Sequence, residues 1–534
     1  MDQRNRFRLE SLGIFLIALL LFTLGIWDQQ PQGFDGRWAL FLQEMFRHGA
    51  SLFPTTYGQP YADYPGTATF FSYVFARLFG APNHLANVLP TALASAGVVA
   101  LIYRLLVPAS RPWALLTVLL TLLTTQLLEK SRSVCLDQMV ALLCVGSFYL
   151  LHSGERLGSR WRQLAVFPLF ILGFAIRGPL GLIEVCGVVC VYWALGRPGE
   201  RVKQVLAHGI VGLVLLAACW WLLLKLARIS GGDAFADEVF KMQVGGRLDE
   251  AGEPFYFYFQ LSLYRYFPVV PLALATLVAL RHRWSERFDD PVQLVMRLGA
   301  CGLMILIGLS VPHFKRAYYI LPMVPMFAAV AAYGLLQAQG WLAGVRRCYE
   351  GLVAALPALC VVVVFVCRHG WQKHGYWPGV SLPLLISALV VLQVAALIAW
   401  RRIGRLVWLS VFALVAQWLV LVTVVEPAKD LQFDTRQFVR QVEALRVSQP
   451  GPLVFLNLGR DTWAVRYMMN LDHDEQPSFI SAADIERLSA LPRPSWVIVA
   501  RKETALLKGT PLEHQAPSFE GRLNDNPLMV FRLE

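Results

Sequence analysis

The sequence predicts a multi-span α-helical membrane protein with interfacial amphipathic helices in its first outward loop and a small C-terminal α/β domain. Hydrophobic residues make up 56% of the 534 residues and charged residues only 16%, so a soluble fold would have to bury almost all of its apolar surface. Long apolar segments recur, and short basic patches separate them. The residues after Glu426-Pro427 are polar and contain strand-like alternation.

The apolar segments predict thirteen transmembrane helices. The first follows Arg4, Arg6 and Arg8, and no small-x-small cleavage site comes after Trp27, which indicates an uncleaved span. The other twelve are expected near residues 84–106, 112–128, 138–152, 163–176, 179–195, 206–227, 263–280, 293–311, 318–336, 351–367, 380–400 and 406–425.

Basic clusters predict the orientation of these spans. When the thirteen spans alternate, six clusters fall on the same side as the N-terminal arginines, and the positive-inside rule makes that side the cytoplasm. The net charge of +12 therefore reflects topology, and no nucleic-acid partner is predicted. The C-terminus faces outward, which in a bacterium is the periplasmic side of the inner membrane. The clusters are Arg104/Arg111, Arg156/Arg160/Arg162, Arg197/Arg201/Lys203, Arg281/Arg283/Arg287, Arg346/Arg347 and Arg401/Arg402/Arg405.

Two domains follow from this topology. Residues 1–426 form the transmembrane domain, with a first periplasmic loop at 28–83, and residues 427–534 form a C-terminal periplasmic α/β domain. In that second domain "GPLVFLNLG" and "SWVIVARKE" have the alternation of strands. Helices are expected near 435–447, 461–470 and 482–491.

The first loop is expected to hold two amphipathic helices in the plane of the interface. One starts after Asp35, and the other follows Asp63 and Tyr64. The apolar stripe of the first consists of Trp38, Phe41, Leu42, Met45 and Phe46, and that of the second of Phe71, Val74, Phe75, Leu78 and Phe79.

Charged residues at the outward ends of the spans are the candidate functional residues, because the positive-inside rule gives no reason for them. Each also has a structural explanation. Asp35 and Asp137 could cap helices, Lys315 and Arg316 could reach toward lipid head groups, and Arg177 could mark a helix break. The full set is Asp35, Asp63, Lys130, Arg132, Asp137, Arg177, Lys315 and Arg316, with His313 and Tyr319 beside the last two.

Together these charges favour a chemical site. Two acids and at least four cations from distant parts of the chain lie on one membrane face, where burial is costly unless they pair or bind a charged ligand. Cations would bind the phosphate of a lipid substrate and stabilise negative charge as it leaves. The carboxylates would act on the acceptor or hold a metal.

At these residues the sequence resembles the GT-C glycosyltransferases that use polyprenyl-phosphate sugars, in particular the branch of the aminoarabinose transferase ArnT and the protein mannosyltransferases. The similarity extends over most of the membrane portion, and the order of its motifs is more specific than any one of them. The motifs are "FDGRWALFLQEMFRHGASLFPTTYGQPYADYPG", "RSVCLDQMVAL", "GFAIRGPLGLI", "EPFYFYFQLSLYRYFPVVPL" and "FKRAYYILPMVPMFAAVAA".

The resemblance implies roles for individual residues. Asp35 would be the essential first-loop acid near the acceptor nucleophile, and Asp137 the second acid that supports the same site. Lys315 and Arg316 would contact the donor phosphate. Arg132, Arg177, Tyr319 and Tyr64 would assist them. The sugar would pass from undecaprenyl phosphate to a cell-envelope acceptor with inversion.

The chain departs from the family at two motifs. The aminoarabinose branch usually has Glu-Lys-Pro-Pro where this chain has "DYPG" at 63–66, so Tyr64 replaces a lysine. The Lys-Gly-Pro motif of the fifth span is Arg177-Gly178-Pro179 here, which keeps the cation. The first departure puts the aminoarabinose donor and the lipid A acceptor in doubt. A divalent metal ion is the one cofactor considered, with Asp63, Glu250 and Glu253 as its candidate ligands.

Alternative functions remain open. The acceptor could be lipid A, a glycan or a protein, and in the last case the enzyme is a protein O-glycosyltransferase. A lipid or solute transporter would place its ionisable residues near the membrane midplane, whereas here they collect at outward loop ends. A relative without catalytic activity that serves as a scaffold is the third alternative, which the substitution at Tyr64 keeps open.

Overall fold

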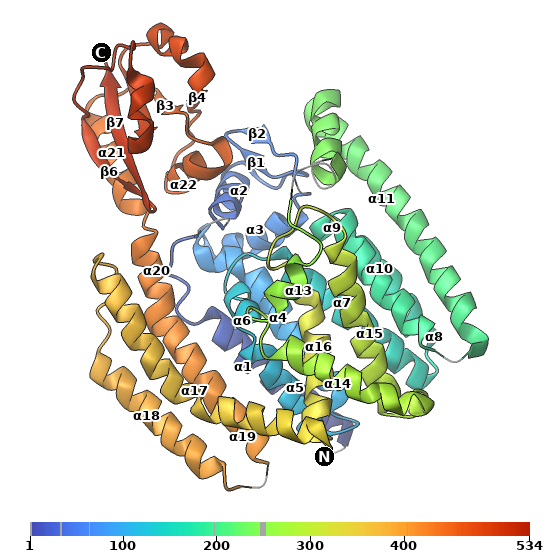
Figure 1. Ribbon diagram of the computed structural model, residues 1–534. Helices are drawn as coiled ribbons and strands as arrows, with labels where there is room; N and C mark the ends of the chain where they lie inside the picture. The colour runs from blue at the N-terminus through green and yellow to red at the C-terminus, as the bar shows by residue number, and fades with distance from the viewer. Residues whose placement is uncertain (1–2, 33–34, 64, 197, 246–251, 403) are drawn as a thin grey trace.

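A helix lies at each of the thirteen apolar segments that the sequence predicts as spans. The computed structural model describes residues 3–32, 35–63, 65–196, 198–245, 252–402 and 404–534 (Figure 1). The helices are α1 (Gln3–Thr23), α4 (His84–Leu106), α5 (Arg111–Leu123), α7 (Leu136–Leu157), α9 (Val166–Arg177), α10 (Pro179–Ala194), α11 (Pro198–Phe240), α14 (Val269–Leu280), α15 (Val292–Ser310), α16 (Val324–Leu336), α17 (Trp341–Gln372), α18 (Leu382–Ala399) and α19 (Arg405–Val420).

The membrane character of this bundle is clear from length and composition. Over the described residues, seven helices are long and apolar enough to cross a membrane, and four shorter apolar helices lie between them. The exact number of crossings stays a prediction. Shorter elements connect the bundle helices: α6 (Thr125–Lys130), α8 (Arg160–Leu164), η1 (Lys241–Gly245), α13 (Phe257–Ser262), η2 (Arg281–Glu286) and η3 (Leu321–Met323).

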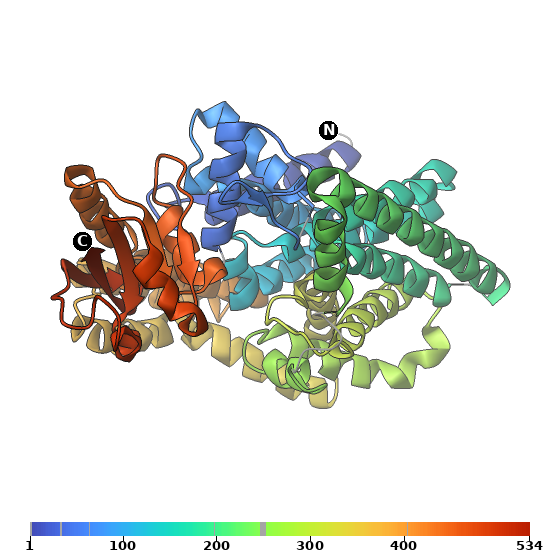
Figure 2. The same ribbon diagram turned by 90° about the horizontal axis from the view of Figure 1, so that it is seen from above.

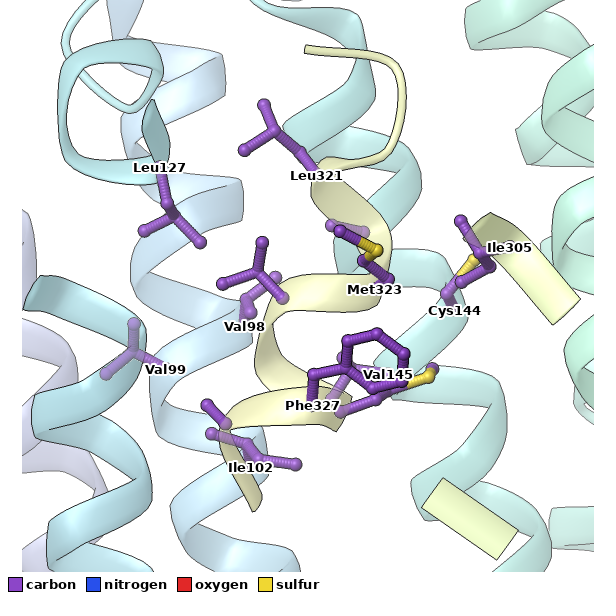
Figure 3. Packing of buried hydrophobic residues seen from close by; sticks show 14 of the residues in the cluster. Val98, Val99, Ile102, Leu127, Cys144, Val145, Ile305, Leu321, Met323 and Phe327 are labelled. Atoms are coloured by element: carbon purple, nitrogen blue, oxygen red, sulfur yellow. The ribbon is translucent and has the colours of Figure 1, made fainter. Parts of the chain in front are cut away.

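The core of the bundle lies where α4, α7, α15 and α16 meet. Figure 3 shows Val98 and Ile102 of α4 near Met323 and Phe327, with Cys144 of α7 on the other side. These five side chains are fully shielded from solvent. The packing of these buried side chains fixes the ends of the helices that carry the candidate site residues.

One close helix contact positions Arg177. Helix α9 ends at this residue, and Gly178 then adopts a φ of +67°, a left-handed conformation that glycine tolerates at little cost. The chain turns there into α10, and a Cβ on Gly173 would lie 2.7 Å from the carbonyl oxygen of Gly181. The helix break expected at Arg177 is therefore present.

The first loop forms a layer over one end of the bundle. Its elements are α2 (Asp35–His48), β1 (Thr55–Thr56), β2 (Gln59–Pro60) and α3 (Thr67–Phe79). The apolar stripe of α2 is buried at Trp38, Phe41 and Met45, and the helix packs on α3 and α4. Its other side contacts the C-terminal domain, where Gln43 donates to the carbonyl of Met469 at 2.6 Å. That second contact adds a role to the helix that its amphipathic pattern alone does not predict.

The C-terminal domain is built on a mixed five-stranded sheet with the order β4-β3-β5-β7-β6. Its strands are β3 (Leu453–Leu456), β4 (Ser478–Ile480), β5 (Ser495–Ala500), β6 (Phe519–Leu523) and β7 (Asn526–Leu533). Strands β4 and β5 run parallel to β3, and β7 runs antiparallel to β5. The two predicted strands correspond to β3 and β5, the central pair, whose residues are all buried.

Helical segments join this sheet to the bundle. Below the domain, α19 continues without a gap into η4 (Leu421–Val425) and α20 (Glu426–Gln432). The predicted boundary at 426/427 stays a prediction. Figures 1 and 2 both show the domain beside the first-loop layer, and Figure 1 shows it above α20. The remaining helical segments are α21 (Arg436–Ser448), η5 (Arg460–Ala464), α22 (Val465–Met468), η6 (Ala482–Ala490) and η7 (Arg501–Leu507).

Candidate active site

A cavity of about 590 Å³ lies where the first loop, the turn between α6 and α7, α20 and the C-terminal domain meet. Polar and charged side chains dominate its lining, and they come from segments as far apart in sequence as Asp35 and Asp525. The residues that line it are Gln29, Gln30, Gln32, Asp35, His84, Glu129, Lys130, Arg132, Ser133, Val134, Cys135, Tyr318, Leu421, Glu426, Lys429, Phe433, Thr462, Trp463, Arg466, Asn524 and Asp525.

Asp35 is the buried acid of this cavity. Its residue is 7% exposed, and its carboxylate accepts a hydrogen bond of 3.1 Å from the backbone N–H of Val134. Burial raises the pKa of Asp35 to about 6, against the opposing effect of the positive charge on Lys130. A carboxyl with this pKa titrates close to neutral pH, which suits a group that exchanges a proton during a reaction.

Two further donors lie beside Asp35 on the turn between α6 and α7. The Nζ atom of Lys130 is 5.3 Å from the centroid of the Tyr318 ring. The Ser133 hydroxyl is buried and has no hydrogen-bond partner among the described residues. A buried hydroxyl without a partner costs free energy unless a ligand or water satisfies it. An ammonium and a hydroxyl at the edge of a polar cavity are suitable donors for a phosphate group.

Arg132 lines the same cavity but is held by protein groups. Its guanidinium donates to both carboxylate oxygens of Glu426, at 2.6 and 2.7 Å. It also donates to the carbonyl oxygens of Leu21 and Leu24 at the end of α1, at 2.7 and 2.8 Å. Arg132 therefore joins three segments of the chain and keeps little capacity for a further ligand.

A second cluster of predicted site residues lies inside the bundle, next to this cavity. The guanidinium of Arg177 pairs with Asp137 at 3.1 Å, and both side chains are 2% exposed. The same guanidinium lies 4.5 Å from the centroid of the Tyr319 ring. Tyr319 packs edge-on against Tyr318, which lines the cavity, with ring centroids 5.4 Å apart. Two tyrosines in edge-on contact thus connect the cavity to the buried ion pair.

Lys315 and Arg316 occupy the loop that leads to these tyrosines. Lys315 is 6% exposed, and its Nζ donates to the carbonyl oxygen of Glu253 at 2.7 Å. Burial lowers the pKa of Lys315 below its usual range. The guanidinium of Arg316 lies 5.0 Å from the ring centroid of Phe314. Both cations are thus close in sequence to Tyr318, but neither lines the cavity that holds Asp35.

The candidate metal ligands do not converge in the described part of the chain. Asp63 pairs with Arg37 at 3.6 Å, and Glu253 is exposed. No three His, Cys, Asp or Glu side chains form a metal-binding group among the described residues. Tyr64 and Glu250 lie outside those residues, so the metal ion and the role of Tyr64 stay predictions.

Sequence reasoning identified several charged residues here and missed their surroundings. Asp35 and Arg132 line one cavity, and Asp137, Arg177 and Tyr319 form the neighbouring cluster. The candidate set did not include Ser133, Glu426 or the cavity wall that the C-terminal domain supplies. Lys130 was noted as an outward-facing charge without a role. The signal in the sequence is the position of Lys130 between Glu129 and Arg132 in "EKSRSVCLD".

Comparison with known proteins supports the resemblance. Residues 63–223 match the family model described as dolichyl-phosphate-mannose-protein mannosyltransferase. No curated protein sequence matches the chain.

Solved structures match over nearly the whole chain. ArnT from Cupriavidus metallidurans bound to undecaprenyl phosphate is 15% identical, with a TM-score of 0.74 over 97% of both chains. Its apo state is 14% identical with the same TM-score and coverage. The oligosaccharyltransferase AglB from Archaeoglobus fulgidus, with an inhibitory peptide and a dolichol-phosphate, is 12% identical. It has a TM-score of 0.51 over 94% of this chain and 71% of its own. The chain therefore has the ArnT-like GT-C fold, as its motifs predict.

Proposed function

We propose that this GT-C protein is a glycosyltransferase that moves a sugar from undecaprenyl phosphate to an acceptor of the cell envelope. The observation that carries the proposal is Asp35, a buried carboxyl with a pKa of about 6, beside Lys130 and a partnerless hydroxyl in a polar cavity. The undecaprenyl phosphate in the similar ArnT structure supports the choice of donor.

The donor phosphate would bind at the bundle side of the cavity. Lys130 and Ser133 supply an ammonium and a hydroxyl there, whereas Lys315 and Arg316 lie on the loop before Tyr318, outside the lining of the cavity. Positive charge at this position stabilises the phosphate dianion that forms when the sugar leaves. Arg132 would act indirectly, because its hydrogen bonds to Glu426 hold two walls of the cavity together.

Asp35 would act as the general base. Its carboxylate removes the proton from the acceptor hydroxyl, and the acceptor oxygen forms a bond to the anomeric carbon of the sugar. The bond between that carbon and the phosphate oxygen breaks, and its electron pair stays on undecaprenyl phosphate. A single displacement of this kind inverts the anomeric configuration, and Asp35 then releases its proton to solvent.

The Asp137–Arg177 pair would support the site from within the bundle. Arg177 is fixed by Asp137 on one side and by the Tyr319 ring on the other. The Tyr319 and Tyr318 rings lie between this guanidinium and the cavity, so Arg177 would orient the tyrosines that border the phosphate site. Asp137 is thus a positioning residue for Arg177.

We propose that the reaction takes place on the periplasmic face of a bacterial inner membrane. The basic clusters at the opposite ends of the spans support this orientation. The acceptor is a lipid, a glycan or a protein of the envelope.

The test is transfer by purified protein with two matched variants. Asp35→Asn removes the base and keeps the shape of the side chain, so we expect transfer from undecaprenyl-phosphate sugars to fall by at least about a thousandfold. Asp28→Asn changes the same residue type at an exposed position of the same loop and should transfer normally. Release of undecaprenyl phosphate, followed by mass spectrometry, is the readout in the presence of an envelope extract.

If Asp35→Asn released undecaprenyl phosphate at the wild-type rate, the proposed mechanism would be wrong. Release by none of the three proteins, despite native folding, would remove the glycosyltransferase function and favour a transporter.

A further inference from the structure

The C-terminal domain supplies one wall of the cavity that contains Asp35. This wall consists of Thr462, Trp463 and Arg466 from η5 and α22, and of Asn524 and Asp525 from the turn between β6 and β7. It faces the turn between α6 and α7, which carries Lys130 and Ser133. The two walls thus belong to different parts of the chain, and the buried acid Asp35 lines the same cavity.

Arg466 is the cation of this wall. Its guanidinium lies 4.7 Å from the centroid of the Trp463 ring, which holds it in place by a cation–π contact. It makes no hydrogen bond or ion pair with any residue in the described parts of the chain. Burial lowers the pKa of Arg466 and the charge of Asp525 raises it, so the guanidinium stays protonated at all physiological pH values.

The stem of Arg466 contacts the start of the helix that carries Asp35. A Cβ on Gly36 would lie 3.9 Å from the Cγ atom of Arg466 and 3.8 Å from Val465. The same Cβ would lie only 3.1 Å from the Sδ atom of Met469 at the end of α22, so a glycine at this position lets α22 approach the first turn of α2 closely. Further along α2, the Arg47 guanidinium donates to the carbonyl of Leu471 at 2.6 Å. Arg466 is therefore fixed relative to Asp35 through direct packing.

Two of the cations that line the cavity, Lys130 and Arg466, have no carboxylate partner at ion-pair distance among the described residues. Arg132 is paired with Glu426, and Lys429 with Glu129 at 3.0 Å. Lys130 and Arg466 remain, on opposite walls. The wall that belongs to the bundle is the one closer to the lipid, so Lys130 suits the donor phosphate.

We propose that Arg466, supported by Trp463, binds an anionic group of the acceptor and so makes the C-terminal domain an acceptor subsite. This inference rests on the proposed glycosyltransferase function. The ligand is a phosphate or a carboxylate carried by the acceptor near its reactive hydroxyl. A guanidinium binds either group through two parallel hydrogen bonds, which fixes the orientation of the ligand as well as its position. Asn524 and Asp525 would hydrogen-bond neighbouring hydroxyl groups.

The test measures binding of small probes to the full-length protein in detergent by calorimetry. Glucose 1-phosphate and glucuronate carry the two candidate anions, and glucose is the neutral probe. We expect the wild type to bind one or both anionic probes, and Arg466→Gln to weaken that binding by about tenfold or more. Arg466→Lys should restore part of the affinity, since it keeps the charge and loses the second hydrogen bond. Arg487→Gln, at a side chain that is 73% exposed, is the control in the same domain.

Undecaprenyl phosphate binding separates this inference from the proposed function. Arg466→Gln should bind undecaprenyl phosphate as tightly as the wild type does. Equal binding of the anionic probes by wild type and Arg466→Gln would overturn the acceptor subsite, and so would a loss of undecaprenyl phosphate binding in that variant. Failure of the wild type to bind undecaprenyl phosphate would instead count against the glycosyltransferase function. Melting temperatures of all variants exclude misfolding as the cause.

Discussion

Arg132 and Glu426 form a two-point ion pair that joins the turn before α7 to the start of α20. Both carboxylate oxygens of Glu426 accept from the guanidinium, at 2.6 and 2.7 Å, and the Arg132 side chain is only 1% exposed. Gln29 of the first loop donates to the same carboxylate at 2.8 Å. One acid thus holds three segments around the cavity.

Removing that acid should destabilise the protein. Glu426→Ala leaves the buried Arg132 charge without its partner, at a cost of about 3–5 kcal/mol. The melting temperature in detergent should fall by several degrees, and Glu426→Gln, which keeps an acceptor oxygen, should fall less. A melting temperature equal to that of the wild type in Glu426→Ala would show that the pair does not hold the fold.

Transfer should depend on pH through Asp35. Burial raises its folded-state pKa to about 6, and only the deprotonated form removes a proton from the acceptor. The rate at limiting acceptor should therefore be level above pH 6 and fall about tenfold per pH unit below it.

Lys130 provides the variant that tests this assignment. Its charge lowers the pKa of Asp35, so Lys130→Met should move the inflection upward by about one pH unit. Lys508→Met, at an exposed position of the C-terminal domain, should leave the inflection unchanged. An inflection that stays at the same pH in Lys130→Met would assign the titration to another group.

Variants of the Asp137–Arg177 pair should show separately what the pair contributes to stability and what it contributes to activity. Asp137→Asn leaves a buried guanidinium beside a neutral amide, which should cost about 3–5 kcal/mol and lower transfer as well. The double variant Asp137→Leu/Arg177→Met replaces both charges by apolar side chains and should recover the melting temperature without recovering transfer. Transfer by the double variant at the wild-type rate would mean that the pair serves the fold alone.

Local patterns in the sequence predicted the helical part of the fold well. Each apolar segment is long enough to specify a helix by its own composition, and a helix is present at every one of them. The same locality explains why Asp35 and Arg177 stood out, since each is a charge at the end of an apolar or amphipathic run. Their partners could not be predicted, because Val134 and Asp137 lie 99 and 40 residues away.

The C-terminal domain was harder to predict. Strands β3 and β5 were found because they are short apolar runs, buried on both faces. The hairpin β6–β7 was missed, although "LNDNP" carries a signal for a two-residue turn. Leu523 pairs with Asn526 across it, and Asn524 has a φ of +61°. That Trp463 and Arg466 face Asp35 follows from the docking of two domains, which no local pattern encodes.

The turn between β6 and β7 gives this architecture a means of evolutionary change. Asn524 is constrained by its positive φ, its burial and the hydrogen bond of 2.9 Å from its N–H to the carbonyl oxygen of Asp434, whereas Asp525 is exposed and can be exchanged with less effect on the sheet. They nonetheless border the reaction cavity. If the proposed acceptor subsite is correct, descendants of this chain can diversify in what they modify by exchanging the residue at position 525, while the membrane part that binds the lipid stays the same.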